Sequence, residues 1–521
     1  MIRSRRFPAA VAACLGALVL AACGGSPSAG NSGEPVGDPV VGGTANVLQI
    51  GEPRSLDPAV LSNAWVLNAF LGNALYGTLL TNDTRSGEIQ YKQAESFDTT
   101  DDGATFTLKL REGLTFSDGS PLNAEAVKFN WDRLKDPELG STSAQEASMI
   151  ASTEVVDART LKITMAEPVP NFAWSVLTTA LNWIASPKAL QAGRESFDAE
   201  PVGAGPYTLE QWTRQDRIEL AKNPEYWDAP KPYLDHVTLR TAADPTQRVN
   251  TMISGGADLS IETNWTMLAK AEEAGLQTDV VPLNGGQYIV MNMRKAPFDD
   301  VRARRAVAAA LDLKAMDVVV YSGKGKLVPS LFTESSRFHT GQKLATQDKA
   351  EAQRLFDELA ADGKPVRYTF TSFATQESRS LAEGVQAQLS AFRNVTVDVK
   401  TVDLSETARL YTTHDYEMMI SSAHFADPEP RLWTAFHSGS RANMSGIADE
   451  RLDAALDAGR TATTLEDRKA AYRTVQERLI ELVPGVFYTR TSPSVMAAQN
   501  VHGITQYGQG SLLPEELWIE E

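Results

Sequence analysis

The sequence predicts a mixed α/β fold with at least two hydrophobic cores. Its 521 residues are ample for a large buried core, and their number suggests more than one lobe. Alternating apolar residues at 105–110 and 161–165 indicate half-buried strands in the first half of the chain. In the second half, strand-like residues 367–372 and 395–399 flank an apolar helical pattern, which predicts a βαβ unit with parallel strands. The two halves therefore differ in strand arrangement.

The first 22 residues have the pattern of a secretory signal. Three arginines within the first six residues precede an apolar run at 9–20, and small residues lead to Cys23. The run is shorter than the roughly 20 residues of a membrane span. A cysteine after Leu-Ala-Ala resembles the lipobox of bacterial lipoproteins, which implies that Cys23 is lipidated and begins the mature protein. A plain secretory peptide cut nearby is the alternative, and the sequence does not decide between Sec and Tat export.

Composition narrows the classes of partner. The formal charge is −17, and loss of the signal's three arginines would take it to −20. A strongly acidic surface argues against binding to nucleic acid or broad adhesion to anionic lipid. The other cysteine, Cys14, lies within the signal, so the mature body has no disulfide and depends on its cores. Residues 23–43 are rich in Gly, Pro and Ser and predict a flexible tether.

The folded body is expected to begin at residue 44, with a first strand near 47–50. Asn123 can cap a helix whose apolar residues Val127, Trp131 and Leu134 share one face. Asp348 and Glu351 have the spacing of a capping box ahead of a further helix. A long final helix is predicted after Thr464.

Two glycine-containing motifs have an architectural interpretation. Residues 116–121, with sequence FSDGSP, are typical of a turn that ends a strand and leads into the helix at Asn123. Residues 203–207, with sequence GAGPY, lack the Lys and Ser/Thr of a phosphate-binding loop. Their glycines more plausibly let a crossover strand pass closely.

Five segments together resemble the family 5 solute-binding proteins of ABC importers, which bind peptides or nickel. They span nearly all of the body in the order that the family has. They are SLDP at 55–58 with LYGTLL at 75–80; FTLKLREGLTFSDGSPLNAEAVKFNWDRL at 106–134; GAGPY at 203–207 with NPEYW at 223–227; PFDDVR at 297–302 with AAALD at 308–312; and Tyr472 with Pro484.

The resemblance implies a two-lobed α/β periplasmic binding protein fold of type II, similar to the large cluster C proteins, with crossover hinge strands. One lobe would comprise 44–287 and 487–521, and the other 288–486. Hinge closure around a ligand is a recurring mechanism of such proteins. The loaded form would dock on a membrane permease whose ATPase subunits supply the energy.

The resemblance also nominates two ligand-binding residues. Similar dipeptide binders hold the ligand's amino group with an aspartate in an Asp-Pro motif, which maps to Asp427, and its carboxylate with an arginine, which maps to Arg379. A carboxylate suits an ammonium, and a guanidinium matches a carboxylate with two parallel hydrogen bonds. Shaping a turn is the alternative role for Asp427, and solvation in a first helical turn is that for Arg379. The following Glu429-Pro430-Arg431 departs from the dipeptide pattern.

Aromatic residues and one histidine complete the candidate site. Trp433, Trp265 and Tyr288 could wall an apolar pocket, although each could equally be core or surface. His424 lies three residues before Asp427, and in relatives that import nickel as a chelate a cleft histidine can touch the metal. A neutral, hydrogen-bonded histidine is the alternative. The six histidines form no compact metal motif, and we expect no resident metal or cofactor.

The leading hypothesis is a monomeric, lipid-anchored peptide receptor on the outer face of the cytoplasmic membrane. A nickel chelate, haem or an opine-like solute on the same fold is the second hypothesis. An extracytoplasmic hydrolase is the third, but the chain has no His-Glu-x-x-His, no Gly-x-Ser-x-Gly and no phosphate-binding loop. A structural surface lipoprotein is the fourth. We therefore expect a transport protein and not an enzyme.

Overall fold

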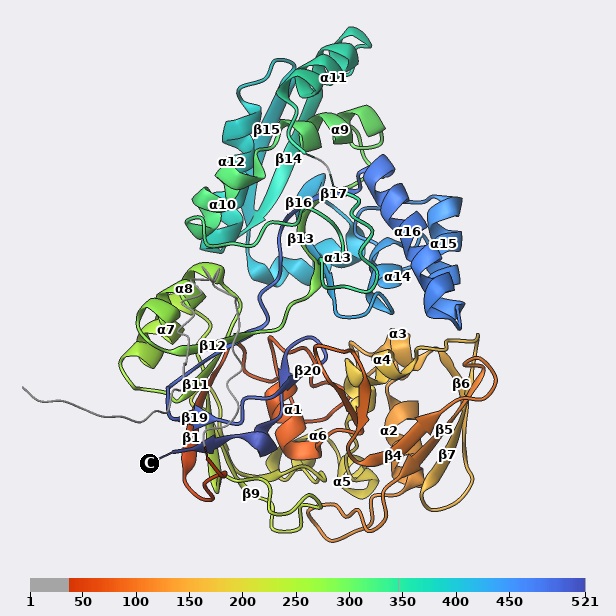
Figure 1. The fold of residues 1–521 in the computed structure, drawn as a ribbon, viewed down its shortest axis with the longest axis vertical. Helices are drawn as coiled ribbons and strands as arrows, with labels where there is room; N and C mark the ends of the chain where they lie inside the picture. The colour runs from red at the N-terminus through yellow and green to blue at the C-terminus, as the bar shows by residue number, and fades with distance from the viewer. Residues whose placement is uncertain (1–36, 345, 521) are drawn as a thin grey trace, which may run out of the picture. The chain divides into compact units, whose positions relative to one another are not determined.

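The computed structural model describes residues 37–344 and 346–520 (Figure 1). The predicted signal, Cys23 and most of the predicted tether lie outside the described residues. No helix within the described part of the chain is both long and apolar enough to cross a membrane.

A seven-stranded mixed sheet carries the first strand of the body. Its order is β12-β18-β11-β1-β10-β9-β8, and β1 runs parallel to both of its neighbours. Helices α7 (Pro245–Ile253) and α8 (Trp265–Glu273) pack on the sheet through Leu48, Val249, Leu268 and Met496. The strands are β1 (Thr44–Gln49), β8 (Tyr207–Thr213), β9 (Arg217–Lys222), β10 (His236–Thr241), β11 (Leu259–Glu262), β12 (Gln277–Val280) and β18 (Ser494–Ala497).

A four-stranded antiparallel sheet contains the two strands predicted in the first half. Its order is β4-β5-β7-β6, in which β5 (Thr105–Leu110) pairs with β7 (Thr160–Met165). The outer strands are β4 (Ala94–Asp98) and β6 (Ile150–Val155). Helix α2 (Ala124–Arg133) contacts this sheet. The Asn123 side chain accepts a hydrogen bond from the Ala126 amide at 3.0 Å, as the predicted cap requires.

Shorter elements surround these two sheets. The helices are α1 (Ala69–Tyr76), α3 (Ala144–Ala147), α4 (Ala173–Leu177), α5 (Pro187–Gln191) and α6 (Arg194–Ala199), with 3₁₀ turns at Ala180–Asn182 and Pro514–Glu516. The strands are β2 (Leu80–Asn82), β3 (Ile89–Tyr91), β19 (Val501–His502), β20 (Gln506–Tyr507), β21 (Ser511–Leu512) and β22 (Trp518–Ile519).

A five-stranded sheet organises the second half, in the order β15-β14-β16-β13-β17. Successive residues of β13 enter different cores: Ile289 and Met291 pack into one, and Tyr288 and Val290 pack into the other. Because side chains alternate across a strand, the two cores lie on opposite faces of this sheet. The strands are β13 (Asn284–Met291), β14 (Val366–Phe373), β15 (Val395–Val402), β16 (Met418–Phe425) and β17 (Gly485–Thr489).

Helices cover both faces of the five-stranded sheet (Figure 1). The predicted βαβ unit is confirmed, because α12 (Gln376–Leu389) joins the parallel strands β14 and β15. The predicted caps are also present: Asp348 caps α11 (Lys349–Ala361), and Thr464 caps α16 (Leu465–Leu482). The remaining helices are α9 (Val301–Ala310), α10 (Leu313–Tyr321), α13 (Thr407–Thr413), α14 (Arg431–Phe436) and α15 (Glu450–Thr461), with a 3₁₀ turn at Leu404–Glu406.

Two short segments carry the chain between the seven-stranded and five-stranded sheets. Residues 281–283 lead from β12 to β13, and residues 490–493 lead from β17 back to β18. The Val281 amide donates to the carbonyl of Pro493 at 2.9 Å. The segments therefore run next to each other, and residues 284–489 contain every strand of the five-stranded sheet.

The two motifs interpreted as architectural have that role. The Phe116 amide bonds to the Ser120 carbonyl at 2.8 Å, closing the predicted turn. A Cβ built on Gly205 would lie 2.3 Å from the Ala74 carbonyl oxygen of helix α1, so the backbones approach too closely for a side chain. The close approach was expected, but its partner is the end of α1 rather than a crossover strand.

Candidate functional site

A cavity of about 340 Å³ brings together segments that are far apart in the sequence. We call it the Arg431 cavity. One side comes from the end of β16 and the start of α14, and the other from loops and short helices of the first half and from the C-terminal segment. Its lining is Ser62–Val66, Thr142, Ser143, Glu146, Leu177–Thr179, His424, Pro430, Arg431, Thr434, Gly508, Gln509 and Ser511.

Hydrogen bonds hold the first-half wall of the Arg431 cavity. The Asn63 amide group donates to the Thr179 carbonyl at 2.8 Å, which ties the 62–66 loop to the end of α4. The hydroxyl of Ser143, which precedes α3, accepts from the Ala180 amide at 3.0 Å. The Ser143 bond ties the chain just ahead of Glu146 to the segment at 180, and the Asn63 bond joins two further lining segments.

Arg431 and Glu146 place opposite charges in the same cavity. Arg431 is the first residue of α14, and its guanidinium donates to the Ser422 carbonyl at 2.6 Å. Glu146 lies on α3, where burial raises the pKa of its carboxyl and the positive charges of Arg431 and Arg460 oppose that rise. The two side chains form no ion pair within 4.0 Å of each other.

His424 adds a neutral polar group to the lining. Burial, and then the positive charge of Arg431, lower the pKa of His424 to about 3, so the ring is uncharged at physiological pH. Its Nδ1 atom is buried and has no hydrogen-bond partner. A ligand atom could supply the missing partner. Among residues 37–344 and 346–520, no group of three or more His, Cys, Asp or Glu side chains is arranged to hold a metal ion.

Asp427 lies four residues before Arg431 in the chain, but its carboxylate is already engaged. Arg468 of α16 donates to both of its oxygens, and Arg337 donates to Oδ2 at 3.1 Å. The backbone amide of Glu429 donates to Oδ1 at 3.1 Å. The Asp427 side chain is 1% exposed and is not among the lining residues. It therefore has the contacts of a structural acid that fixes the turn into α14.

Glu429 is neutralised in the same way. Its Oε1 accepts from Arg460 of α15 at 2.9 Å. Burial raises the pKa of Glu429 to about 7, and Arg460 opposes that rise. Arg460 also lies over the Trp433 ring, 4.1 Å from its centroid. Glu429 thus pairs with Arg460 and not with Arg431, which lines the cavity.

The structure does not bring Arg379 to the cavity. Arg379 lies in the first turn of α12, as the sequence comparison implied, and is half-buried. The helix is capped by Thr375, whose hydroxyl accepts from the Ser378 amide at 3.2 Å. Neither Arg379 nor Asp427 is among the residues that line the Arg431 cavity.

The three aromatic candidates also lie outside the cavity lining. Tyr288 is 1% exposed and stacks on Phe487 with ring centroids 5.0 Å apart, so its ring belongs to the core. The Trp433 ring stacks on His437, and its Nε1 donates to Asp457 at 2.8 Å.

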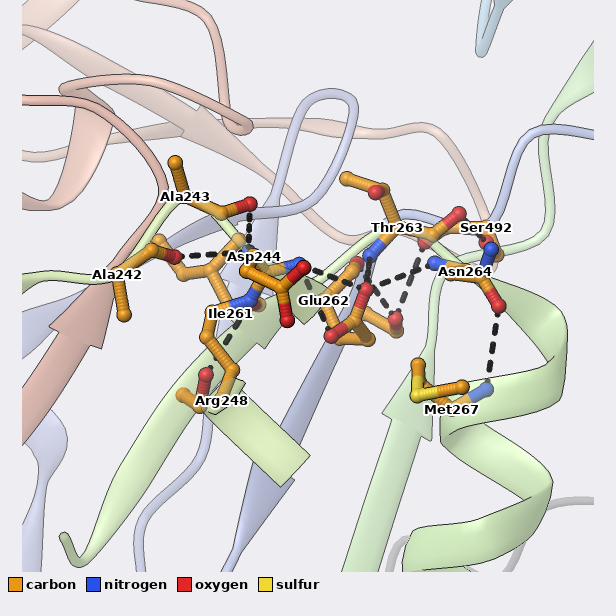
Figure 2. Close-up of polar contacts among 12 residues, drawn as sticks. Ala242, Ala243, Asp244, Arg248, Ile261, Glu262, Thr263, Asn264, Met267 and Ser492 are labelled. Carbon is orange, nitrogen blue, oxygen red and sulfur yellow. Dashed lines mark hydrogen bonds and ion pairs between the residues drawn. The ribbon is translucent and has the colours of Figure 1, made fainter. Parts of the chain in front are cut away.

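Trp265 is fastened to a connecting segment. Its Nε1 donates to the carbonyl of Arg490 at 2.9 Å, and Asn264, which caps α8, precedes it. It follows Glu262, whose carboxylate pairs with the buried guanidinium of Arg248 at 2.9 Å (Figure 2). The Glu262 carboxylate also accepts from the Thr263 amide at 2.7 Å. This network positions the end of β11 beside the segment at 490–493.

Sequence reasoning missed Glu146 and the segments at 62–66 and 508–511. Glu146 lies on a four-residue helix with no motif around it. Arg431 did leave a signal, because the Glu-Pro-Arg run departs from the dipeptide pattern at that position. Ion pairs between helices determine which arginine of the second half faces the cavity. These pairs cannot be recognised from the local sequence.

Comparisons with known proteins agree with this architecture. Residues 88–443 match the sequence model of the bacterial extracellular solute-binding proteins, family 5 Middle. The glutathione-binding protein GsiB of Escherichia coli K12 is 31% identical over 313 residues, covering 57% of this chain and 60% of that protein. The GsiB of Salmonella typhi is 30% identical over 294 residues, covering 56% and 57%. The chain thus spans about three fifths of the curated relatives that it matches.

Solved structures share the fold over nearly the whole chain. The binding protein AgaA of A. tumefaciens R10, solved with agropinic acid, has a TM-score of 0.79 and 24% identity, covering 92% of this chain and 99% of that one. DppA of Helicobacter pylori, solved with the peptide STSA, has a TM-score of 0.80 and 22% identity over the same shares. The predicted α/β periplasmic binding protein fold is therefore confirmed. The chain belongs to the bacterial extracellular solute-binding proteins of family 5.

Proposed function

We propose that this protein captures a small solute, a short peptide in the first instance, and delivers it unaltered to an ABC import permease. The observation that carries the proposal is the Arg431 cavity, whose mixed polar and apolar lining comes from β16 and α14 on one side and from loops and short helices of the first half and the C-terminal segment on the other. Its volume of about 340 Å³ lies at the lower end of the roughly 300–1,000 Å³ of small-molecule sites. The GsiB relatives are named for glutathione, a short peptide.

Capture would use closure of two lobes about the connecting segments at 281–283 and 490–493, which lie a few residues outside the second lobe as it was predicted, 288–486, and inside the first, 44–287 with 487–521. Only residues 281–283 and 490–493 join the two large sheets along the chain, and the bond from Val281 to Pro493 holds them together. Two adjacent short segments suit a hinge, because small backbone rotations there move many residues. Ligand contacts on both walls of the cavity would favour the closed form.

The protein would work outside the cytoplasmic membrane, anchored by lipid on Cys23 and tethered by 23–43. Extracellular location follows from the family, and the lipid anchor is supported by the residues around Cys23. We propose that it acts as a monomer and not as an enzyme, with the permease and its ATPase subunits as partners. Tethering would keep the loaded protein near the permease.

Thermal unfolding of the full chain, produced with its own leader, tests the proposal. Dipeptides, glutathione, free amino acids, a nickel chelate and haem are added separately. A solute at 100 times its Kd should stabilise the protein by about 2.7 kcal/mol, and mass spectrometry should recover it intact. If only haem or only the nickel chelate stabilised the protein, that solute and not a peptide would be the transported ligand. A cleaved product would contradict a binding role, and no response to any solute would contradict the proposal.

A further inference from the structure

We propose that the Arg431 cavity selects small zwitterions, with Arg431 binding the ligand carboxylate and Glu146 binding its ammonium group. This inference rests on the proposed function, since it assumes that the cavity holds the transported solute. It assigns the charge recognition to two residues that lie outside the Asp-Pro motif.

Arg431 is a cation without an acidic partner. Among residues 37–344 and 346–520, no carboxylate oxygen lies within 4.0 Å of its guanidinium, and the Ser422 carbonyl is the acceptor that it reaches. The neighbouring arginines differ: Arg468 and Arg337 pair with Asp427, and Arg460 pairs with Glu429. A guanidinium has five N–H donors, so Arg431 retains donors for a bidentate carboxylate.

Glu146 is the matching anion. In the described part of the chain, no Lys, Arg or His nitrogen lies within 4.0 Å of its carboxylate, and no other residue's side chain donates to it. It is partly buried, and burial disfavours its charged form. A desolvated carboxylate without a partner is costly, and a ligand ammonium would remove that cost.

The separation of the two groups points to a ligand between them. Both side chains line one cavity, yet they do not pair with each other. If the cavity served only stability, direct contact would satisfy both charges. Another polar lining residue, His424, is neutral and has an unpartnered Nδ1, so it can bond an uncharged ligand atom such as a peptide N–H or carbonyl.

Charge pairing also argues against Asp427 as the ammonium site. Its two carboxylate oxygens accept from Arg468, Arg337 and a backbone amide. A ligand ammonium would have to displace a buried arginine, which would leave that guanidinium unpaired. The cavity of about 340 Å³ further limits the ligand to a few residues.

Isothermal titration calorimetry with capped ligands tests the inference. The probe is the tightest-binding dipeptide with uncharged side chains, together with its N-acetylated and C-amidated forms. Removing a charged hydrogen-bond partner costs about 10- to 100-fold in affinity. On the unsubstituted protein, each cap should therefore weaken binding by about that factor. Full affinity of either capped form would overturn the inference, and this arm requires no mutant to fold.

Variants then assign each end of the ligand. Arg431→Gln should weaken the free peptide about 10- to 100-fold and the C-amide little, and Arg431→Lys should restore part of the affinity. Glu146→Gln should weaken the free peptide and leave the N-acetyl form unchanged. The exposed residues Arg441 and Glu138 provide matched controls, Arg441→Gln and Glu138→Gln, which should bind as the unsubstituted protein does.

The outcomes separate this inference from the proposed function. Equal losses for free and capped peptides in both variants would overturn the zwitterion assignment while peptide binding stood. Selective loss of ammonium recognition in Asp427→Asn would place the amine there instead. Binding of only an uncharged solute or a metal chelate would overturn the inference alone. If none of the solutes bound, the proposed function itself would be overturned, and the inference that rests on it would fall with it.

Discussion

At the scale of single residues, the pairing of buried charges decides which groups remain for a ligand. Asp427 and Glu429 precede Arg431 within five residues of sequence, yet three arginines from other parts of the chain neutralise the two acids. Arg431 is left to face the cavity. Asp427 does not line the cavity, and its partner Arg468 is 41 residues away, so this pairing could be found only from the packing of α16.

The pair between Arg468 and Asp427 should stabilise the fold rather than bind ligand. Both side chains are at most 5% exposed, so Arg468→Met would leave a buried carboxylate with only Arg337 and the Glu429 amide as partners. We expect a loss of about 3–5 kcal/mol in the free energy of unfolding, measured by urea denaturation. Arg337 contacts the same carboxylate from a side chain that is 43% exposed, and Arg337→Met should cost less than about 1 kcal/mol. Equal losses in the two variants would contradict this assignment.

Two buried glutamates should make stability fall as pH rises. Burial raises the pKa of Glu515 to about 7, as it does for Glu429. The folded state then holds a proton more tightly than the unfolded state. The stabilising contribution is present below about pH 4.5 and is lost as pH approaches 7.

Glu515→Gln should remove part of this pH dependence. The contribution is on the order of 1–3 kcal/mol between pH 5 and pH 8, since one pKa unit corresponds to about 1.4 kcal/mol. Denaturation curves at pH 5, 6, 7 and 8 measure it. Glu138→Gln on the surface should keep the slope of the unsubstituted protein. An unchanged slope in Glu515→Gln would show that this carboxyl does not hold its proton.

At the scale of elements, the features that depend only on residues close together in the sequence, namely helix caps and the βαβ unit, could be predicted. The caps at Asn123, Asp348 and Thr464 were foreseeable because a capping side chain bonds to a backbone amide three residues ahead. The βαβ unit followed from a change of apolar period. Sheet order and the position of the four-residue helix α3 were not foreseeable, because both depend on contacts distant in sequence.

The contact between Gly205 and helix α1 gives a test at this scale. In Gly205→Ala, the new methyl group would lie 2.3 Å from the carbonyl oxygen of Ala74 and 2.5 Å from the carbonyl carbon of Leu75. Backbone atoms cannot yield as a flexible side chain does, so we expect a loss of about 1–3 kcal/mol by urea denaturation. Gly51→Ala meets only a Leu67 methyl at 3.6 Å and should be nearly neutral. A neutral Gly205→Ala would show that the two backbones lie farther apart.

At the scale of the whole molecule, family membership and fold could be predicted from ordered motifs, because these motifs build turns and close contacts. Of the predicted ligand residues, His424 lines the cavity, whereas the other five do not. The Tyr288 ring is buried in the core. The indole N–H of Trp433 donates to Asp457, and that of Trp265 donates to the Arg490 carbonyl. Architecture depends on many residues across the chain, whereas the ligand site depends on a few side chains whose partners vary.

Lobe closure predicts a change in small-angle X-ray scattering. A saturating peptide should reduce the radius of gyration of the full chain, because contacts on both walls of the cavity favour closure. Arg431→Gln should need about 10- to 100-fold more peptide for the same reduction. Arg441→Gln should respond as the unsubstituted protein does. Profiles that do not change with any bound solute would contradict the closure mechanism.

The adjacency of the two connecting segments has a consequence for how the chain can be divided. The stretch 284–489 leaves and re-enters the seven-stranded sheet at neighbouring points, marked by the bond from Val281 to Pro493. It has the topology of a domain inserted into another domain. A short linker could replace residues 284–489 without interrupting any strand of the remaining domain, and circular permutation could give the inserted domain its own termini.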